Sequence, residues 1–308
     1  MSKPYRVVGS LTTMPNQYFK LPGTLSSLNN QTRKLDAIYL GLPQVSRRMS
    51  SEYPELPQEI SKLCTVVRCE DYGPITKIVP GLLMETDPNT VVITFDNDMH
   101  YHPDTVAKLI EHHESYPESA IGSSGMLLKY KCPACAITPN ENEQISRVAK
   151  FAIPNEGRRV DSVYGYPGAL YTRGMFPSNE DLEKKFLDYA LLDNNMLMND
   201  DIVISGYLSL HNVERRIFPN MPEVGFTLTN GVRERSGSEI SYNIDKFFQR
   251  MNLAIDTARS QGMYAITEPM DSSETIIGVS AIIVLCFLAA LIIFIYLIVY
   301  GFGDWFSF

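Results

Sequence analysis

Residues 90–98 read TVVITFDND, and this stretch decides the fold that we expect. The first six residues are β-branched or aromatic, a composition typical of a buried strand. The last three are Asp96, Asn97 and Asp98, so two carboxylates follow directly after an apolar segment. A charged side chain at the end of a buried strand costs free energy unless it is paired or binds a ligand such as a metal ion. The stretch therefore predicts a strand that presents an acidic site at its carboxyl end.

Apolar runs and helical patterns alternate around this strand. Further strands are expected over residues 5–12, 37–42 and 65–69. Helices are expected over residues 21–30, over residues 76–86 with a distortion at Pro80, and from Pro103 onward. This alternation predicts an α/β fold with a mainly parallel sheet and helices on both faces. In such sheets, ligands bind beyond the carboxyl ends of the strands.

The second half of the chain is less regular. Strands are expected over residues 120–128 and 163–171, and helices over residues 180–192 and 201–211. Ser236 and Glu239 match a capping box, and the helix that they open is expected to run to about Gln261, with Gly262 as its stop.

The composition changes near the C-terminus. Residues 275–303 contain no charged side chain, although 20% of the whole chain is charged. A helix over residues 276–300 would rise ~37 Å at about 1.5 Å per residue, enough to cross a hydrocarbon core of ~30 Å. We therefore expect a catalytic domain over residues 1–264, a linker over 265–275, one transmembrane helix over 276–300 in the lipid bilayer, and a tail over 301–308.

The orientation of this segment is not set by flanking charge, because neither end carries Lys or Arg. The N-terminal apolar stretch is too short for a signal peptide, which favours a single-pass C-terminal anchor with the catalytic domain in the cytosol. Five cysteines, an odd number, fit a reducing compartment. The formal net charge of −8 makes nucleic-acid binding an unfavourable prospect, because an acidic surface repels phosphate backbones.

Asp96 and Asp98 are the first candidates for chemistry. Two carboxylates at the end of a central strand can share a hard divalent cation such as Mg²⁺ or Mn²⁺, which would neutralise a diphosphate leaving group. A solvated acidic turn is the alternative. His100 and His102 continue the alternation, so a zinc-like cluster is a rival prediction unless Pro103 ends the strand first. His112 and His113 lie on the following helix, where we expect solvent exposure.

Asp200 and Asp201 precede the apolar helical pattern of residues 202–210. Acidic side chains at a helix N-terminus are favoured by the helix dipole, so a purely structural role is a serious alternative. The functional interpretation is that one of the two carboxylates takes a proton from an acceptor hydroxyl.

Other segments carry weaker signals. Asp71 could bind a nucleobase N–H and Lys77 a phosphate, and residues 165–168 (GYPG) could form a sugar platform or a plain turn. Arg233 and Arg235 could hold phosphates or lie in a solvated loop. Four cysteines could form a zinc site, although nothing else supports one: Cys64, Cys69, Cys132 and Cys135.

Six motifs, taken in their order and spacing, resemble those of family 2-like glycosyltransferases of the GT-A kind, similar to transferases of large DNA viruses and bacteria. The resemblance covers roughly residues 5–215. The motifs are SLTTMP at 10–15, NNQTRKLDAIYLGLP at 29–43, DYGPITK at 71–77, TFDNDMHYHPDTV at 94–106, YGYPGALYTRGMF at 164–176 and NDDIVISGYLS at 199–209.

The resemblance implies a GT-A fold and transfer of a sugar from a UDP- or GDP-sugar to a hydroxyl of a glycan or glycoprotein, with inversion. Asp98 would bind Mn²⁺ or Mg²⁺, and Asp96 the metal or the ribose. Asp201 would be the base, but Asp200 stands where the family has Glu, so which of the two acts stays open. The processive Gln-x-x-Arg-Trp motif is absent, which favours a single transfer.

The remaining roles implied by the resemblance concern the nucleotide and the metal. His211 is the candidate for a further metal ligand. The expected nucleotide-binding residues are Thr12, Thr13, Pro15, Asp71, Lys77, Asp96, Asn97 and Arg235.

Three other classes compete with this prediction. A sugar nucleotidyltransferase can share the fold, but it usually has a Gly-rich first loop that bears Arg and Lys, which SLTTMPNQ lacks. An aspartyl phosphohydrolase needs D-x-D followed by a small residue and then Thr or Val, and DNDMH does not fit this pattern. A non-catalytic membrane adaptor with a degenerate transferase fold meets no such objection and is separated only by the absence of turnover.

Overall fold

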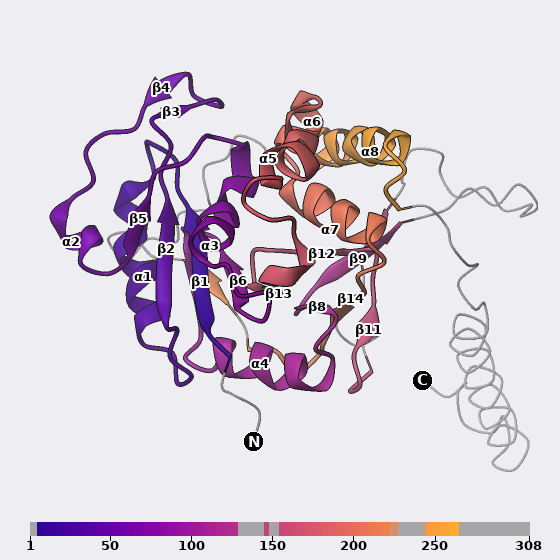
Figure 1. The fold of residues 1–308 in the computed structure, drawn as a ribbon, viewed down its shortest axis with the longest axis horizontal. Helices are drawn as coiled ribbons and strands as arrows, with labels where there is room; N and C mark the ends of the chain where they lie inside the picture. The colour runs from indigo at the N-terminus through magenta and orange to yellow at the C-terminus, as the bar shows by residue number, and fades with distance from the viewer. Residues whose placement is uncertain (1–4, 129–144, 148–153, 223, 227–243, 265–308) are drawn as a thin grey trace, which may run out of the picture. The chain divides into compact units, whose positions relative to one another are not determined.

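The computed structural model describes residues 5–128, 145–147, 154–222, 224–226 and 244–264 (Figure 1). All of them belong to one compact unit, Met1–Ala265. The expected linker, transmembrane helix and tail lie outside the described residues, as do Arg233, Arg235, Cys132, Cys135 and the capping box. Within the described part, no helix is long and apolar enough to cross a membrane.

An eight-stranded sheet forms the centre of the unit, in the order β11-β14-β8-β13-β6-β1-β2-β5. The pairs β5–β2, β2–β1, β1–β6 and β14–β8 are parallel, whereas β13 runs antiparallel between β6 and β8. The chain thus has an α/β fold with a mainly parallel sheet, as the sequence predicts. The strands are β1 (Val7–Thr12), β2 (Ala37–Gly41), β5 (Thr65–Val67), β6 (Val91–Phe95), β8 (Ala120–Gly122), β11 (Arg158–Arg159), β13 (Ala169–Thr172) and β14 (Arg215–Ile217).

Three small sheets flank the large one. They join β9 (Gly125–Leu128) to β10 (Ile145–Arg147) and β12 (Ser162–Val163), β7 (Met99–His100) to β15 (Gly225–Phe226), and β3 (Val45–Ser46) to β4 (Ser51–Glu52).

Helices cover both faces of the sheet because its buried strands alternate their side chains between two apolar cores. In β6, Val91 and Ile93 pack with α1 (Leu21–Asn29) and α4 (Thr105–Ser115). Val92 packs on the opposite face, with α3 (Val79–Met84), α7 (Asp200–Leu210) and α8 (Ile244–Ser260). α4 and α7 accordingly lie on opposite sides of the sheet (Figure 1). The shorter helices are η1 (Tyr18–Lys20), α2 (Gln58–Ser61), η2 (Gly73–Lys77), η4 (Arg173–Met175), α5 (Leu182–Lys185), η5 (Leu187–Leu191) and α6 (Asn194–Leu197).

Several predicted elements are divided in the structure. Residues 120–128 form β8 and β9, which belong to different sheets. Residues 163–171 are interrupted by a turn in which Gly168 adopts a φ of 96° and its N–H bonds to the carbonyl of Gly165. Pro80 lies in the first turn of α3, which begins at Val79, rather than distorting a longer helix, and residues 73–77 form the separate η2. Local turn chemistry thus divides segments that look continuous by hydrophobicity.

The expectation for the two histidines of α4 is wrong. His113 is buried, and the His112 ring stacks on Phe218 with 3.8 Å between ring centroids. α4 packs this part of its surface into the core, which the sequence pattern did not indicate. The end of α8 does match its prediction, because Gly262 follows the helix with a φ of 80°.

Candidate active site

The candidate site lies beyond the carboxyl ends of β1 and β6, which are neighbours at the point where the strand order reverses. Open α/β sheets bind their ligands at such a point. Two acidic segments meet there. The strand-end triplet is Asp96, Asn97 and Asp98, which follows β6, and the helix-start triplet is Asn199, Asp200 and Asp201, which begins α7.

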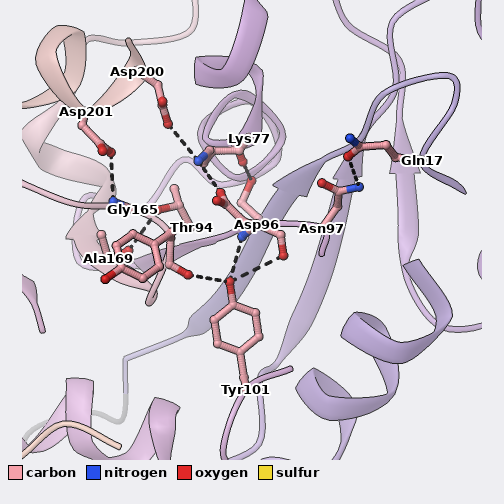
Figure 2. A network of polar contacts seen from close by, with 12 residues as sticks. Gln17, Lys77, Thr94, Asp96, Asn97, Tyr101, Gly165, Ala169, Asp200 and Asp201 are labelled. Atoms are coloured by element: carbon pink, nitrogen blue, oxygen red, sulfur yellow. Dashed lines mark hydrogen bonds and ion pairs between the residues drawn. The ribbon is translucent and has the colours of Figure 1, made fainter. Parts of the chain in front are cut away.

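The backbone of the strand-end triplet is fixed by a buried tyrosine. The Asp96 N–H donates to the Tyr101 hydroxyl at 2.8 Å (Figure 2). This hydroxyl in turn donates to the carbonyl of Tyr166 at 3.1 Å. The Asn97 side-chain amide donates to Thr13 Oγ1 at 2.9 Å and to Gln17 Oε1 at 3.2 Å. The triplet is therefore tied both to the loop after β1 and to the loop before β13.

Asp98 lies beside a second buried residue, Lys20. The Lys20 ammonium is 3.6 Å from Asp98 Oδ2, and the two side chains are 5% and 13% exposed. Burial raises the pKa of the Asp98 carboxyl, the negative charge of Asp96 adds to this rise, and Lys20 opposes it. The separation is longer than an ordinary hydrogen bond, so Lys20 holds Asp98 only loosely.

The two carboxylates of the helix-start triplet have different partners. Asp201 Oδ1 accepts a hydrogen bond from the Gly165 N–H at 2.9 Å, whereas Asp200 faces Lys77. Burial, together with the neighbouring Asp200, raises the pKa of Asp201 well above its usual range, against the opposing effects of Lys77 and the Gly165 N–H. Asn199, not either aspartate, occupies the N-cap position of α7.

Lys77 joins the two triplets. Its ammonium forms an ion pair with the Asp96 carboxylate and another with Asp200 Oδ2, at 2.8 Å (Figure 2). Its side chain is only 9% exposed. Burial opposes the charge on Lys77, but Asp200, Asp96 and Asp201 hold its pKa well above the ordinary value. The lysine is therefore a charged group between two acidic segments.

The DYGPITK motif forms the turn that carries this lysine. Asp71 is buried, and its two carboxylate oxygens accept hydrogen bonds from the backbone N–H groups of Gly73 and Arg47, each at 2.7 Å. Gly73 has a φ of 74°, and a Cβ there would lie 2.4 Å from the carbonyl oxygen of Leu197. The structure thus uses Asp71 to support the turn that ends at Lys77, and it places Lys77 against carboxylates.

Three more of the predicted nucleotide-binding residues, Thr12, Thr13 and Pro15, lie at the end of β1 and in the loop that follows it. The Thr12 hydroxyl donates to the carbonyl of Gly41, Thr13 is buried against Asn97, and Pro15 is half-buried in the turn before η1. Thr13 and Pro15 are thus near the strand-end triplet in the fold. Arg235 lies outside the described residues.

His211 is not brought to the acidic site. It is exposed, and it follows the C-terminus of α7, ten residues from Asp201, which corresponds to about 15 Å along the helix axis. Across the described residues, no three His, Cys, Asp or Glu side chains form a metal-binding group, so neither the predicted His211 ligation nor the rival zinc-like cluster at His100 and His102 is formed there. Cys64 and Cys69 are free thiols.

Three contributors to the site were not identified from the sequence. Lys20 lies at the end of η1, just before α1, and Tyr101 follows β7. The Gly165 N–H comes from the turn at residues 165–168, for which the sequence predicts a sugar platform or a plain turn. The one sequence signal was the charge of Lys20 inside the otherwise apolar stretch of residues 18–22 (YFKLP).

No family model matches the chain, and no curated protein matches it. A solved structure described as "Crystal structure of 4-diphosphocytidyl-2C-methyl-D-erythritol synthase" aligns with a TM-score of 0.41 and 9% sequence identity. The alignment covers 80% of this chain and 99% of that chain. The likeness is too slight to bear on the chemistry of this site.

Proposed function

We propose that the chain is a glycosyltransferase of the GT-A kind that moves a sugar from a nucleoside-diphosphate donor to a hydroxyl of a glycan or glycoprotein. The observation that carries the proposal is the meeting of the two acidic triplets across Lys77 at the carboxyl edge of the sheet. Such a site needs one set of carboxylates for the diphosphate side and another for the acceptor side. The separate positions of Asp98 and Asp201 fit that division.

A divalent cation fits the donor side of this site. Asp96 and Asp98 offer hard oxygen ligands, which Mg²⁺ and Mn²⁺ prefer. When all four aspartates of the two triplets are ionised, they exceed the two lysines by two negative charges (four minus two). Mg²⁺ is commonly held by one or two carboxylates together with substrate phosphates, so a third protein ligand is not required. Held by Asp98, with Asp96 close beside it, the metal would neutralise charge on the leaving diphosphate.

The acceptor side is supplied by Asp201. The acceptor oxygen attacks the anomeric carbon as the bond from that carbon to the diphosphate oxygen breaks, and the acceptor proton passes to the Asp201 carboxylate. Inversion follows from a single displacement. The Gly165 N–H fixes Oδ1 of this carboxylate, and burial raises its pKa, which makes the deprotonated carboxylate a stronger base than an ordinary aspartate.

The test is a product analysis with the full-length chain. Purified protein is incubated with Mn²⁺ and a panel of UDP- and GDP-sugars, with and without glycan acceptors, and separately with nucleoside triphosphates and sugar phosphates. We expect release of UDP or GDP, together with a glycosylated acceptor or, without acceptor, the free sugar from hydrolysis of the donor. Pyrophosphate formation would instead identify a sugar nucleotidyltransferase. The absence of turnover with every mixture would favour the non-catalytic membrane adaptor. Asp181→Asn, a surface aspartate that pairs with Lys185, is the matched control.

We also propose that residues 276–300 anchor the protein in a membrane with the catalytic domain in the cytosol. The support is the run of 29 uncharged residues from 275 to 303. Deletion of residues 275–308 is expected to release the protein from membranes, and protease is expected to digest the catalytic domain on intact vesicles. A protected domain would contradict the proposed orientation.

A further inference from the structure

Lys77 is held more rigidly than a surface lysine. Its backbone carbonyl accepts a hydrogen bond from the Ser10 hydroxyl at 2.7 Å, and Ser10 Oγ in turn accepts from the Gly81 N–H at 3.0 Å. Gly81 has no room for a side chain, because a Cβ would lie 2.6 Å from Val92 Cγ1. The ammonium is therefore presented from a fixed point between β1 and α3.

The two ion pairs of Lys77 divide the four aspartates of the site into two kinds. Asp96 and Asp200 are its partners. Within the part of the chain that the structure describes, Asp98 lies 3.6 Å from Lys20, and Asp201 accepts from the Gly165 N–H. A carboxylate that is bonded to an ammonium group is a poorer ligand for a second cation and a poorer proton acceptor, because part of its charge is already compensated.

We propose that Lys77 is a positioning residue that occupies Asp96 and Asp200 as its counter-ions, so that Asp98 is left for the divalent cation and Asp201 for the acceptor proton. The assignment of these two roles rests on the proposed function, but the competition between Lys77 and a divalent cation does not. In this arrangement the DYGPITK turn, through Asp71 and Gly73, serves to place an ammonium group between the triplets.

A purely structural ion pair makes a different prediction. If Lys77 only stabilised the fold, its removal would weaken every property of the site together. If it competes with a divalent cation, its removal frees Asp96 and Asp200, and metal binding to the nucleotide-free protein becomes tighter. Metal affinity in the absence of nucleotide therefore separates the two roles.

The experiment measures Mn²⁺ binding to the nucleotide-free full-length chain by electron paramagnetic resonance. Lys77→Met is expected to tighten Mn²⁺ binding by about tenfold or more, since a unit positive charge is removed beside the metal ligands. Lys77→Arg keeps the charge and is expected to stay near the wild type. Lys108→Met, at a lysine that is 38% exposed and paired with Glu111, is the matched control. In transfer assays, Lys77→Met is expected to lower kcat more than it raises the donor KM.

Unchanged or weaker Mn²⁺ binding by folded Lys77→Met would overturn the inference. Should that variant not fold, Asp200→Asn decides: it leaves Lys77 to Asp96 alone, so Mn²⁺ binding should weaken, and tighter binding would overturn the inference. If the wild type binds no Mn²⁺ but Lys77→Met does, the inference stands while the metal-dependent mechanism fails. If no folded variant binds Mn²⁺, both fail.

Discussion

The strand-end triplet and the helix-start triplet are built from the same side chains, one asparagine and two aspartates each, yet they are held in different ways. Both carboxylates of the strand-end triplet face lysines, and its backbone is tied to Tyr101. The helix-start triplet shares Lys77 through Asp200, but Asp201 is held by a neutral backbone N–H. We therefore propose that the surroundings of the two triplets, and not their composition, separate a cation-binding role from a proton-accepting one.

The strongest way to break this comparison is at Asp98. Asp98→Asn keeps the shape of the side chain but removes the charge that we assign to the metal, and we expect transfer to fall by ~10³-fold or more, equivalent to ~4 kcal/mol of transition-state stabilisation. EDTA should abolish wild-type turnover to a similar extent. Initial rates with Mn²⁺ titrated back provide the measurement.

Asp104→Asn is the control, because Asp104 is half exposed and its carboxylate accepts a hydrogen bond from the Thr32 hydroxyl at the surface. Full activity in EDTA would show that the strand-end triplet does not hold a metal.

The second prediction separates the two aspartates of α7. Asp201→Asn should lower the transfer rate by ~10²-fold or more, the usual scale for loss of a general base, with little change in donor binding. Because its pKa is raised, the base is deprotonated only at higher pH than an ordinary aspartate, so the wild-type rate should fall as pH drops through that raised pKa.

Asp200→Asn should cost less activity, because Asp200 is expected to act only through Lys77. If Asp200→Asn is inactive while Asp201→Asn is active, the two roles are exchanged.

The sequence predicted the parts of this site that depend on local pattern. The apolar stretch 90–95 placed β6, and the charge at its end indicated a site, because both signals lie in one short segment. The partnership of residues 77, 96 and 200 has no such signal, since it depends on how η2, β6 and α7 pack.

Asp71 shows the opposite difficulty. A buried carboxylate that supports a turn and one that binds a ligand look the same in the sequence, so the two backbone N–H groups that Asp71 accepts from could not be predicted from the motif. The division of residues 120–128 between two sheets was hidden for a related reason, because β8 and β9 are similarly apolar and the turn between them spans two serines.

The third prediction tests the support of the strand-end triplet. Tyr101→Phe removes the hydroxyl that accepts from the Asp96 N–H and donates to the Tyr166 carbonyl, so two polar groups lose a partner. We expect the free energy of unfolding to fall by ~1–3 kcal/mol, measured by urea denaturation. Tyr5→Phe is the control, because its hydroxyl makes an exposed 3.3 Å bond to Glu114 and should matter little. Equal stability of the two variants would mean that Tyr101 does not hold the triplet.

The smallest expected effect concerns the position of Asp201. A Cβ at Gly165 would lie 3.2 Å from Asp201 Oδ1 and 3.5 Å from Lys77 Nζ, a tight approach but not an impossible one. Gly165 does not have a positive φ, so Gly165→Ala should fold and move the carboxylate by a few tenths of an ångström. We expect kcat to fall only a few-fold, or less than ~1 kcal/mol, because the N–H that holds Oδ1 remains.

Gly168→Ala is the informative partner for this variant, because Gly168 lies in the same turn at a φ of 96°. Its alanine should strain the backbone and lower stability by ~1 kcal/mol or more, while the chemical step changes less than in Gly165→Ala. The two variants therefore separate the effect of the turn's conformation on stability from the effect of its contact with the Asp201 carboxylate on kcat. If Gly168→Ala lowers kcat and Gly165→Ala does not, Asp201 is positioned by the conformation of the turn, which presents the Gly165 N–H, and not by the free space beside Gly165.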